Sequence, residues 1–436
     1  MKFCMVTTFF GGHSFGGDAA YVDRLARALL RRGHEVHIVH CVDAFNAVRG
    51  KHPLRPYDPP EGLHVHRLQS RWGVLSPVAT QLTGEPWFKQ RALREILDAH
   101  DVDVVHFHNI SLVGGAGVLN LAKHAVKIMT AHEHWIICPM HLLWKNGCKA
   151  CDAPACTTCS LRAGKPPQFW RALGSIDRGL SQLDALVFPS HHALELHRRR
   201  GIGAPMMHLP YFLPDDWTDG LEDDDPEPSG RPYLAAAGRL VRMKGFQRII
   251  PLMRYLPEVD LRIAGTGPFE QKLRHLARGL PNVRFEGLLG RNPLLRLFHG
   301  ARAVVVPSLF PETFGYVVLE AFSVRTPVIV DRNGGALEET GVRSGGGLGF
   351  ESDAELLLAM RRLVHDDSLR AELSYRGFAR RTGEWSERAH LDRYFDLIRS
   401  VRSARSQATR MAHPAHGAGT KEHSPATLPV SLGGAA

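Results

Sequence analysis

Short apolar runs alternate with segments of helical period along the first half of the chain. Residues 2–8 are apolar and end in a glycine-rich loop, and residues 18–32 follow with apolar side chains at helical spacing. Gly33 stops this helix, and residues 35–40 form the next predicted strand. A helix near 112–124 and further strands are predicted, the strands at 103–107, 126–130 and 184–188. Buried strands that alternate with helices predict a parallel sheet covered on both faces.

The pattern breaks at residues 214–230. This stretch holds the acidic run Glu222 to Asp225 and then Pro226, Pro228 and Gly230, so we interpret it as an interdomain linker. A second alternating series follows, with strands expected at 233–237, 260–264, 283–285, 303–307 and 327–330. The sequence therefore predicts an α/β protein with two Rossmann-like domains, residues 1–213 and 231–384, whose loops face a central cleft.

The C-terminal segment follows a third pattern. Helices between 354 and 380 close the second domain, and residues 385–402 are expected to form one more helix that packs back on the first domain, with Ser386 as its N-cap. Residues 403–436 are rich in Ser, Ala, His, Gly and Pro without a period, which predicts a disordered tail.

Length, composition and charge agree with this organisation. A chain of 436 residues is too long for one ordinary core, and 44% hydrophobic residues with 22% charged residues are globular values. The net charge of +10 suits anionic partners, among them nucleotide phosphates, anionic lipid and nucleic acid, without choosing among them. No apolar run approaches the roughly 18 residues that span a bilayer, and the N-terminus lacks a signal-peptide pattern, so we expect a cytoplasmic protein.

The most informative motif is Pro-Glu-Thr-Phe-Gly at 311–315, which follows a buried strand and precedes a helix. Backbone N–H groups and the positive helix end should meet there at the carboxyl edge of the sheet. Glu312 in the loop is placed to accept hydrogen bonds from sugar hydroxyls, and Glu320 in the helix from the two hydroxyls of a ribose. The alternative, a helix-start carboxylate and a solvated glutamate, is disfavoured by the strand–loop–helix context.

Two cations bracket another loop of the second domain. Arg239 and Lys244 follow a predicted strand, where they are suited to neutralise a diphosphate and the charge that builds on it as a sugar departs. A solvated basic loop is the alternative. In the first domain, Gly16 and Gly17 precede a helix and allow phosphate to approach the backbone, although the strict dinucleotide fingerprint is missing.

Two further loops follow predicted strands. His132, after the strand 126–130, is a candidate contact for the donor sugar or the acceptor, and Glu133 is a candidate general base; packed or solvated roles are the alternatives. Residues 331–335 follow the strand 327–330, and their glycines allow the backbone to approach the transferred sugar.

Cysteines gather between residues 138 and 159. After Cys138, the spacing C-x2-C-x4-C-x2-C indicates a structural zinc site, with the candidate ligands Cys148, Cys151, Cys156 and Cys159. The four-residue spacer is shorter than in usual zinc ribbons, so a disulfide or free thiols remain open. We expect this insertion to form a flap over the acceptor side.

Taken together, these motifs resemble the retaining glycosyltransferases of family 4, which have the GT-B fold. The features that match are Gly16-Gly17, Gly238-Arg239-Leu240 with Lys244-Gly245, Pro311 to Gly315 with Glu320, and Asn333-Gly334-Gly335 with Glu338.

The resemblance implies a metal-independent transfer from a nucleotide-diphosphate sugar, with no cofactor needed for catalysis. It also implies that Arg239 and Lys244 hold the diphosphate, that Glu320 holds the ribose, and that Glu312 with Thr313, Phe314 and Gly315 holds the sugar. His132 falls where the family has a histidine near the donor sugar. The family's usual next residue is aspartate, and Glu133 departs from it.

The expected acceptor is a glycan or a lipid-linked molecule in cell-surface polysaccharide biosynthesis. Basic and aromatic residues in the first domain are compatible with peripheral contact with the anionic inner face of a membrane, namely Arg162, Lys165, Phe169, Trp170, Arg171 and Arg178. The competing interpretations are a nucleotide-sugar epimerase and a zinc-stabilised nucleic-acid-binding protein. The spread of the charge and the lack of an aromatic RNA-binding signature favour the transferase, without nucleic acid as a partner.

Overall fold

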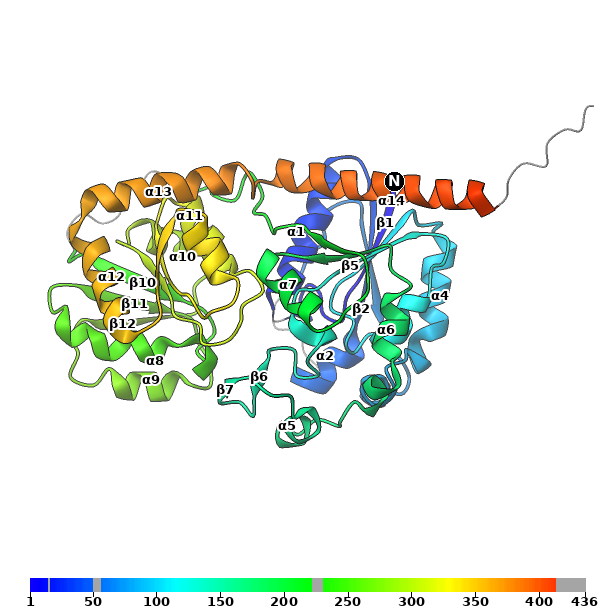
Figure 1. Ribbon diagram of the computed structural model, residues 1–436, viewed down its shortest axis with the longest axis horizontal. Coiled ribbons are helices and arrows are strands. Elements are labelled where there is room, and N and C mark those ends of the chain that lie inside the picture. Colours follow the sequence, from blue (N-terminus) through cyan, green and yellow to red (C-terminus); the bar gives the residue numbers. More distant parts are fainter. Residues whose placement is uncertain (15, 50–55, 222–229, 413–436) are drawn as a thin grey trace, which may run out of the picture.

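The computed structural model describes residues 1–14, 16–49, 56–221 and 230–412, which form two α/β units side by side (Figure 1). The first unit holds a seven-stranded parallel sheet in the order β3-β2-β1-β4-β5-β8-β9. Its strands are β1 (Lys2–Val6), β2 (Glu35–Cys41), β3 (Leu63–Leu68), β4 (Val104–Phe107), β5 (Val126–Thr130), β8 (Ala185–Phe188) and β9 (Met206–His208).

Helices cover the faces of this sheet because their apolar stripes require burial. The α-helices are α1 (Gly17–Arg31), α2 (Val42–Arg49), α3 (Leu75–Thr83), α4 (Gln90–Ala99), α5 (Cys156–Arg162), α6 (Ser175–Leu180) and α7 (His191–Arg199). Shorter 3-10 turns are η1 (Trp87–Lys89), η2 (Gly115–Asn120), η3 (His134–Ile136) and η4 (Phe169–Leu173), and the cysteine segment forms a hairpin of β6 (Trp144–Lys145) and β7 (Lys149–Ala150).

The second unit holds a six-stranded parallel sheet in the order β12-β11-β10-β13-β14-β15. The strands are β10 (Tyr233–Ala237), β11 (Asp260–Ala264), β12 (Val283–Gly287), β13 (Val304–Val306), β14 (Val328–Asp331) and β15 (Gly347–Phe350). The helical elements are η5 (Arg242–Lys244), α8 (Phe246–Ile249), η6 (Ile250–Tyr255), α9 (Glu270–Leu276), α10 (Arg291–His299), α11 (Tyr316–Ser323), η7 (Glu338–Arg343), α12 (Asp353–His365), α13 (Asp367–Thr382) and α14 (Glu387–Ala412). The prediction of two Rossmann-like domains with parallel sheets is confirmed.

One predicted helix is different in kind. The segment near 112–124 forms only the 3-10 turn η2 rather than an α-helix. It contains Gly114, Gly115 and Gly117, which disfavour a helix, and a Cβ on Gly115 would lie 2.4 Å from the carbonyl oxygen of Gly84. This stretch is therefore shaped by close backbone packing rather than by helical period.

The last helix, α14, returns to the first unit and runs along it (Figure 1). The Tyr394 hydroxyl lies 3.0 Å from Nδ1 of His106, and the Tyr21 hydroxyl lies 3.1 Å from Nε2 of His390. Ser386 accepts a hydrogen bond from the amide of Ala389, as expected of an N-cap.

The prediction that a disordered tail begins at residue 403 is wrong for its first ten residues. The helix continues to Ala412, and Arg402 and Arg405 form ion pairs with Asp103 and Asp184 of the first unit. These ion pairs, which the composition did not indicate, place the last turns against the first unit, although exposed pairs of this kind contribute only about 0–1 kcal/mol each. Residues 413–436 of the predicted tail lie outside the described residues, as do residues 222–229 of the predicted linker.

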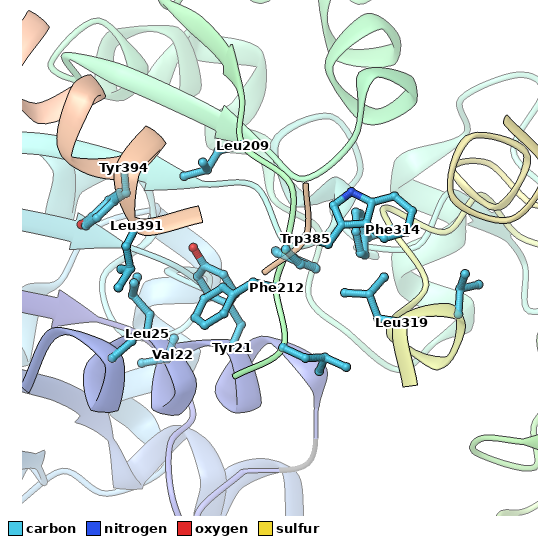
Figure 2. Close-up of a cluster of buried hydrophobic side chains, with 14 of the residues drawn as sticks. Tyr21, Val22, Leu25, Leu209, Phe212, Phe314, Leu319, Trp385, Leu391 and Tyr394 are labelled. Atoms are coloured by element: carbon cyan, nitrogen blue, oxygen red, sulfur yellow. The ribbon is translucent and has the colours of Figure 1, made fainter. Parts of the chain in front are cut away.

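One hydrophobic cluster connects the two units. It includes Tyr21 of α1, Phe212 before the linker, Phe314 of the second unit, Trp385 and Tyr394 (Figure 2). Because apolar side chains from both units and from α14 share this core, the two sheets are held at close range.

Candidate functional site

The second sheet has a topological switch point between β10 and β13. From β10 the order runs outward through β11 and β12, and from β13 it runs the other way through β14 and β15. In such sheets, ligands bind outside the carboxyl ends of the strands at the point where the order reverses. The two loops that leave these strands meet there, and the amide of Leu309 donates to the carbonyl of Met243 over 2.8 Å.

The centre of the meeting point is an ion pair between two predicted residues. Nζ of Lys244 lies 2.5 Å from Oε1 of Glu312, and the Ser308 hydroxyl donates to the same oxygen over 2.8 Å. The side chains are 28% and 13% exposed, so both reach solvent while they are held in place. A Cβ on Gly245, whose φ is +75°, would lie 1.8 Å from the carbonyl oxygen of Pro307, so this glycine lets the lysine loop close onto the end of β13.

The loop after β14 holds the backbone of the same site through hydrogen bonds. The Glu312 amide donates to the carbonyl of Gly334, the Ala336 amide donates to the carbonyl of Glu312, and a Cβ on Gly335 would lie 2.7 Å from the nitrogen of Glu312. Asp331, at the end of β14, pairs with Arg248. This stretch therefore fixes the backbone that carries Glu312.

Glu320 lies on α11 in a half-buried position. Burial raises the pKa of its carboxyl, and the positive charge of Arg24 partly offsets the rise. The Arg24 guanidinium lies between two rings, 4.4 Å from that of Trp217 and 4.5 Å from that of Tyr316. A carboxylate that has given up part of its hydration is ready to accept hydrogen bonds from hydroxyl groups.

We expect the affinity for a nucleoside diphosphate to fall as the pH drops through the raised pKa of Glu320. If Glu320 accepts hydrogen bonds from ribose, as the family resemblance implies, protonation removes the charge that accepts them, and Glu320→Gln should flatten this pH dependence. Because the folded-state pKa is raised, this group stabilises the ligand-free fold at low pH, and that contribution is lost as the pH rises through the folded pKa. Calorimetric titration with UDP, GDP and ADP at a series of pH values on both sides of the raised pKa checks the prediction. The same dependence of affinity on pH in Glu320→Gln as in the parent protein contradicts it.

The remaining donor-site candidates have mixed surroundings. Arg239 is exposed beside the lysine loop, outside the pair formed by Lys244 and Glu312. The Thr313 hydroxyl donates to the carbonyl of His132 over 2.8 Å, so it links the two units. Phe314 is 2% exposed and packs in the shared core, and Gly315 precedes α11 with φ of +93°. For Phe314, only the backbone is suited to meet a ligand.

The first unit presents its own switch point between β1 and β4. Gly16 and Gly17 begin α1 there, and a Cβ on Gly17 would lie 3.7 Å from the ring of Tyr316. The start of α1 therefore faces the start of α11, and a third link comes from His134, whose Nε2 donates to the Pro311 carbonyl over 2.9 Å. Loops at the carboxyl ends of both sheets thus meet at one place.

His132 is held entirely by protein groups. Nδ1 lies 2.5 Å from the Tyr211 hydroxyl and Nε2 lies 2.9 Å from Nδ1 of His108. Burial lowers the pKa of His132 to about 3, so the ring is neutral at neutral pH. A direct contact with a sugar would require one of these hydrogen bonds to be exchanged.

The sequence indicated Glu133 beside this histidine but not the polar side chains that surround it, Asp18, Asn109 and His141. The Asn109 amide donates to Asp18 over 3.2 Å and to Glu133 over 3.1 Å, and His141 lies 2.5 Å from the same Glu133 oxygen. Burial, and next the charge of Glu133, raise the pKa of Asp18. The available signal was positional, because Asp18 follows the glycine pair and Asn109 follows β4.

The cysteine segment divides its thiols into two groups. Cys138, Cys151, Cys156 and Cys159 line one pocket, whereas Cys148 is exposed and its thiol donates to the Lys145 carbonyl. Within the described part of the chain, no three of these sulfurs lie within 4.8 Å of one another. The predicted set of Cys148, Cys151, Cys156 and Cys159 is therefore not brought together as a set.

Comparison with known proteins adds an independent observation. Residues 15–210 match the model of Glycosyltransferase Family 4, and residues 221–380 match that of Glycosyl transferases group 1. The lipopolysaccharide core biosynthesis glycosyltransferase LpsE of Rhizobium meliloti is 35% identical over 179 residues, which are 40% of this chain and 51% of that relative. The chain thus aligns with about half the length of that protein.

Solved structures share the fold along nearly the whole chain. Sucrose-phosphate synthase from Thermosynechococcus elongatus has a TM-score of 0.69 at 20% identity and covers 93% of this chain and 100% of its own. HepE of Anabaena, solved in complex with UDP, has a TM-score of 0.62 at 16% identity and covers 92% and 100%. With both halves matched in order and the two parallel sheets in place, the chain belongs to the family 4 glycosyltransferases with the GT-B fold.

Proposed function

We propose that this glycosyltransferase takes its sugar from a nucleotide-diphosphate donor and transfers it with retention of the anomeric configuration. The observation that carries the donor assignment is the Lys244–Glu312 pair at the switch point of the second sheet, and the retention of configuration rests on the family resemblance. The lysine supplies positive charge for a diphosphate, and the glutamate supplies a carboxylate for sugar hydroxyls. Arg239 on the same loop adds a second cation for the phosphates.

The transfer we propose needs no protein nucleophile. The bond between the anomeric carbon and the phosphate oxygen breaks, a bond to the acceptor oxygen forms on the same face, and the departing phosphate takes the acceptor's proton. The protein then contributes orientation and charge stabilisation. Lys244 and Arg239 would stabilise the negative charge that develops on the leaving diphosphate.

Relatives support the donor and acceptor classes. HepE was solved with UDP, and LpsE is described as acting in lipopolysaccharide core biosynthesis. We therefore propose a glycan or lipid-linked acceptor in cell-surface polysaccharide biosynthesis.

A donor panel tests the proposal. The full chain, incubated with UDP-, GDP- and ADP-sugars, is expected to hydrolyse one class slowly, and NMR of the released sugar reports the retained configuration. Absence of binding to every nucleotide sugar would reject the donor assignment, and inversion would reject the mechanism. Nucleic-acid binding with a steep salt dependence would instead support the rival function.

None of the described helices is long and apolar enough to cross a bilayer. We also propose peripheral membrane contact through the first unit, and this proposal rests on an exposed apolar surface. On α3, Leu75, Val78 and Leu82 are 41–56% exposed at helical spacing. Exposed side chains of the neighbouring η1 and η4 extend this surface, namely Trp87, Phe88, Phe169 and Leu173, and the exposed ring of Trp72, in the turn before α3, stacks on that of Phe88.

Charge complements these apolar side chains. Arg71 and Lys165 are exposed on the loops that precede α3 and η4. Apolar and aromatic side chains next to cations are typical of surfaces that rest on anionic lipid. Two residues expected on this surface are placed elsewhere, since Trp170 is buried and Arg171 packs against the rings of Trp135 and Trp170.

The double variant Trp87→Ser, Phe88→Ser should bind anionic vesicles at least about tenfold more weakly, since each buried aromatic side chain contributes about 1.5–3 kcal/mol. Co-sedimentation with phosphatidylglycerol vesicles measures the change. Leu288→Ser is the matched control, because Leu288 is 80% exposed but lies in the second unit. Equal loss in the control would reject this surface as the docking face.

The cysteine segment remains a proposed structural zinc site, now with Cys138 in place of Cys148. This proposal rests on the pocket that Cys138 shares with Cys151, Cys156 and Cys159, and it requires the segment to close around the metal. Cys151→Ser should lose about one equivalent of zinc in elemental analysis of the purified protein, whereas Cys148→Ser should keep it. Equal zinc in Cys151→Ser and the parent protein contradicts the proposal.

A further inference from the structure

A group of histidines lies at the free edge of the first sheet, away from the loops that meet the second unit. β3 is the edge strand, and its register with β2 pairs His37 with His64 and Val39 with His66. Because side chains alternate along a strand, His37, His64 and His66 share one face. His100, at the end of α4, lies over the same face, with its ring 4.2 Å from that of His37.

Three of these imidazoles converge. Nδ1 of His37 lies 2.9 Å from Nε2 of His66, and the ring of His100 lies 5.3 Å from that of His66. One nitrogen from each of His37, His66 and His100 lies within 4.8 Å of the other two. Small movements would bring three nitrogens to about 2.0–2.1 Å from a common ion, the distance at which imidazole binds zinc.

A carboxylate orients the central ring. Nε2 of His37 lies 3.0 Å from Oε1 of Glu35, so the ring donates its Nε2–H to the carboxylate and leaves the Nδ1 lone pair facing the other histidines. Metal-binding histidines commonly donate their second N–H to a carboxylate in this way.

From this convergence we infer that His37, His66 and His100 form a binding site for a divalent transition-metal ion. Three imidazoles suit Zn²⁺, Ni²⁺ and Cu²⁺, and water would complete the coordination. The ion would tie the edge strand β3 to β2 and to the end of α4. The inference is independent of the proposed donor, acceptor and cysteine site.

A second group with three potential ligands is less suitable. His191, His208 and Glu339 also lie within 4.8 Å of one another, but the Glu339 carboxylate accepts hydrogen bonds from the amides of His191 and His192. These bonds cap the start of α7, and a metal would compete with them. We therefore do not propose this group as a metal site, and a variant of His208 serves as a comparison in the binding experiment.

The test uses the full chain and Co²⁺ or Ni²⁺. We expect one equivalent to bind at the histidine site, with the visible spectrum of nitrogen and oxygen coordination and separate from any metal that the cysteines hold. Equilibrium dialysis should show at least a hundredfold weaker binding at this site in His66→Gln and His100→Gln. His275→Gln, an exposed histidine of the second unit, is the matched control. Binding that persists in both site variants, or that is lost only in His208→Gln, overturns the inference.

Further readouts separate this site from the cysteines and from loss of folding. A sulfur-to-cobalt charge-transfer band that disappears in Cys151→Ser would mark the thiolate site, whereas the histidine site should be unchanged in that variant. Saturating Ni²⁺ should raise the Tm of the parent protein and of His275→Gln but not that of folded His66→Gln. Glu35→Gln should weaken binding by about 10–100-fold while the three ligands remain. An equal rise in Tm for His66→Gln would again refute the site.

Discussion

Lys244→Ala is expected to lower kcat/KM for sugar transfer by about 10²–10³, the usual cost of removing one preorganised group that stabilises developing charge. The lysine ends the 3-10 turn η5 in the loop after β10, with its Nζ 2.5 Å from Glu312, so its ammonium is already placed at the switch point before a donor arrives. Because it would act mainly on the charge of the leaving diphosphate, kcat should fall more than the affinity for the donor. Steady-state kinetics with the donor found in the panel measures both.

Arg242→Ala is the matched control for Lys244→Ala. Arg242 lies in the same 3-10 turn but is exposed, so its loss should change kcat/KM only slightly. Lys244→Arg should recover part of the activity because the charge is kept while the geometry changes. Equal kinetics for Lys244→Ala and the parent would remove this residue from the donor site.

Glu312→Gln should also lower kcat/KM by about 10² or more, but through the loss of contacts with the transferred sugar rather than with the diphosphate. The amide keeps the shape of the side chain but loses the charge that holds Lys244 and accepts the Ser308 hydroxyl. Since the carboxylate is proposed to grip the transferred sugar, binding of free UDP or GDP should change little while turnover falls. Calorimetry of the nucleotide and kinetics of transfer together measure this split.

The losses of activity in Lys244→Ala and Glu312→Gln should not be additive. If Lys244 and Glu312 act as one unit, the double variant loses about as much activity as the worse single variant. Glu372→Gln, an exposed glutamate of α13 paired with Arg376, serves as the control for a general effect of lost negative charge. Full additivity would mean that the pair in the structure has no joint role.

The fold was predictable because segments with the hydrophobic periodicity of strands or helices alternate clearly with polar loops rich in glycine and proline. Buried strands such as 126–130 and 304–306 are short apolar runs that end where polar loops begin, and this pattern needs no knowledge of tertiary contacts. The proximity of Lys244 and Glu312 followed from the same logic, since carboxyl ends of parallel strands meet at one edge.

Other features depend on contacts between distant residues. His132 lies after a strand as predicted, but its hydrogen bonds to His108 and Tyr211 come from three-dimensional packing that no local pattern encodes. Cysteine spacing likewise could not show that Cys138, ten residues upstream, shares the pocket that Cys148 does not reach.

The return of α14 to the first unit has a consequence for how the chain is made. Leu391, Tyr394 and Ile398 share a buried cluster with Phe3 and other side chains of the first unit. At the usual synthesis rate of about 5–20 residues per second, this helix leaves the ribosome roughly 10–40 s after the end of that unit. During that interval the first sheet of the nascent chain exposes an apolar face. Chaperones can bind this face until α14 is synthesised and covers it.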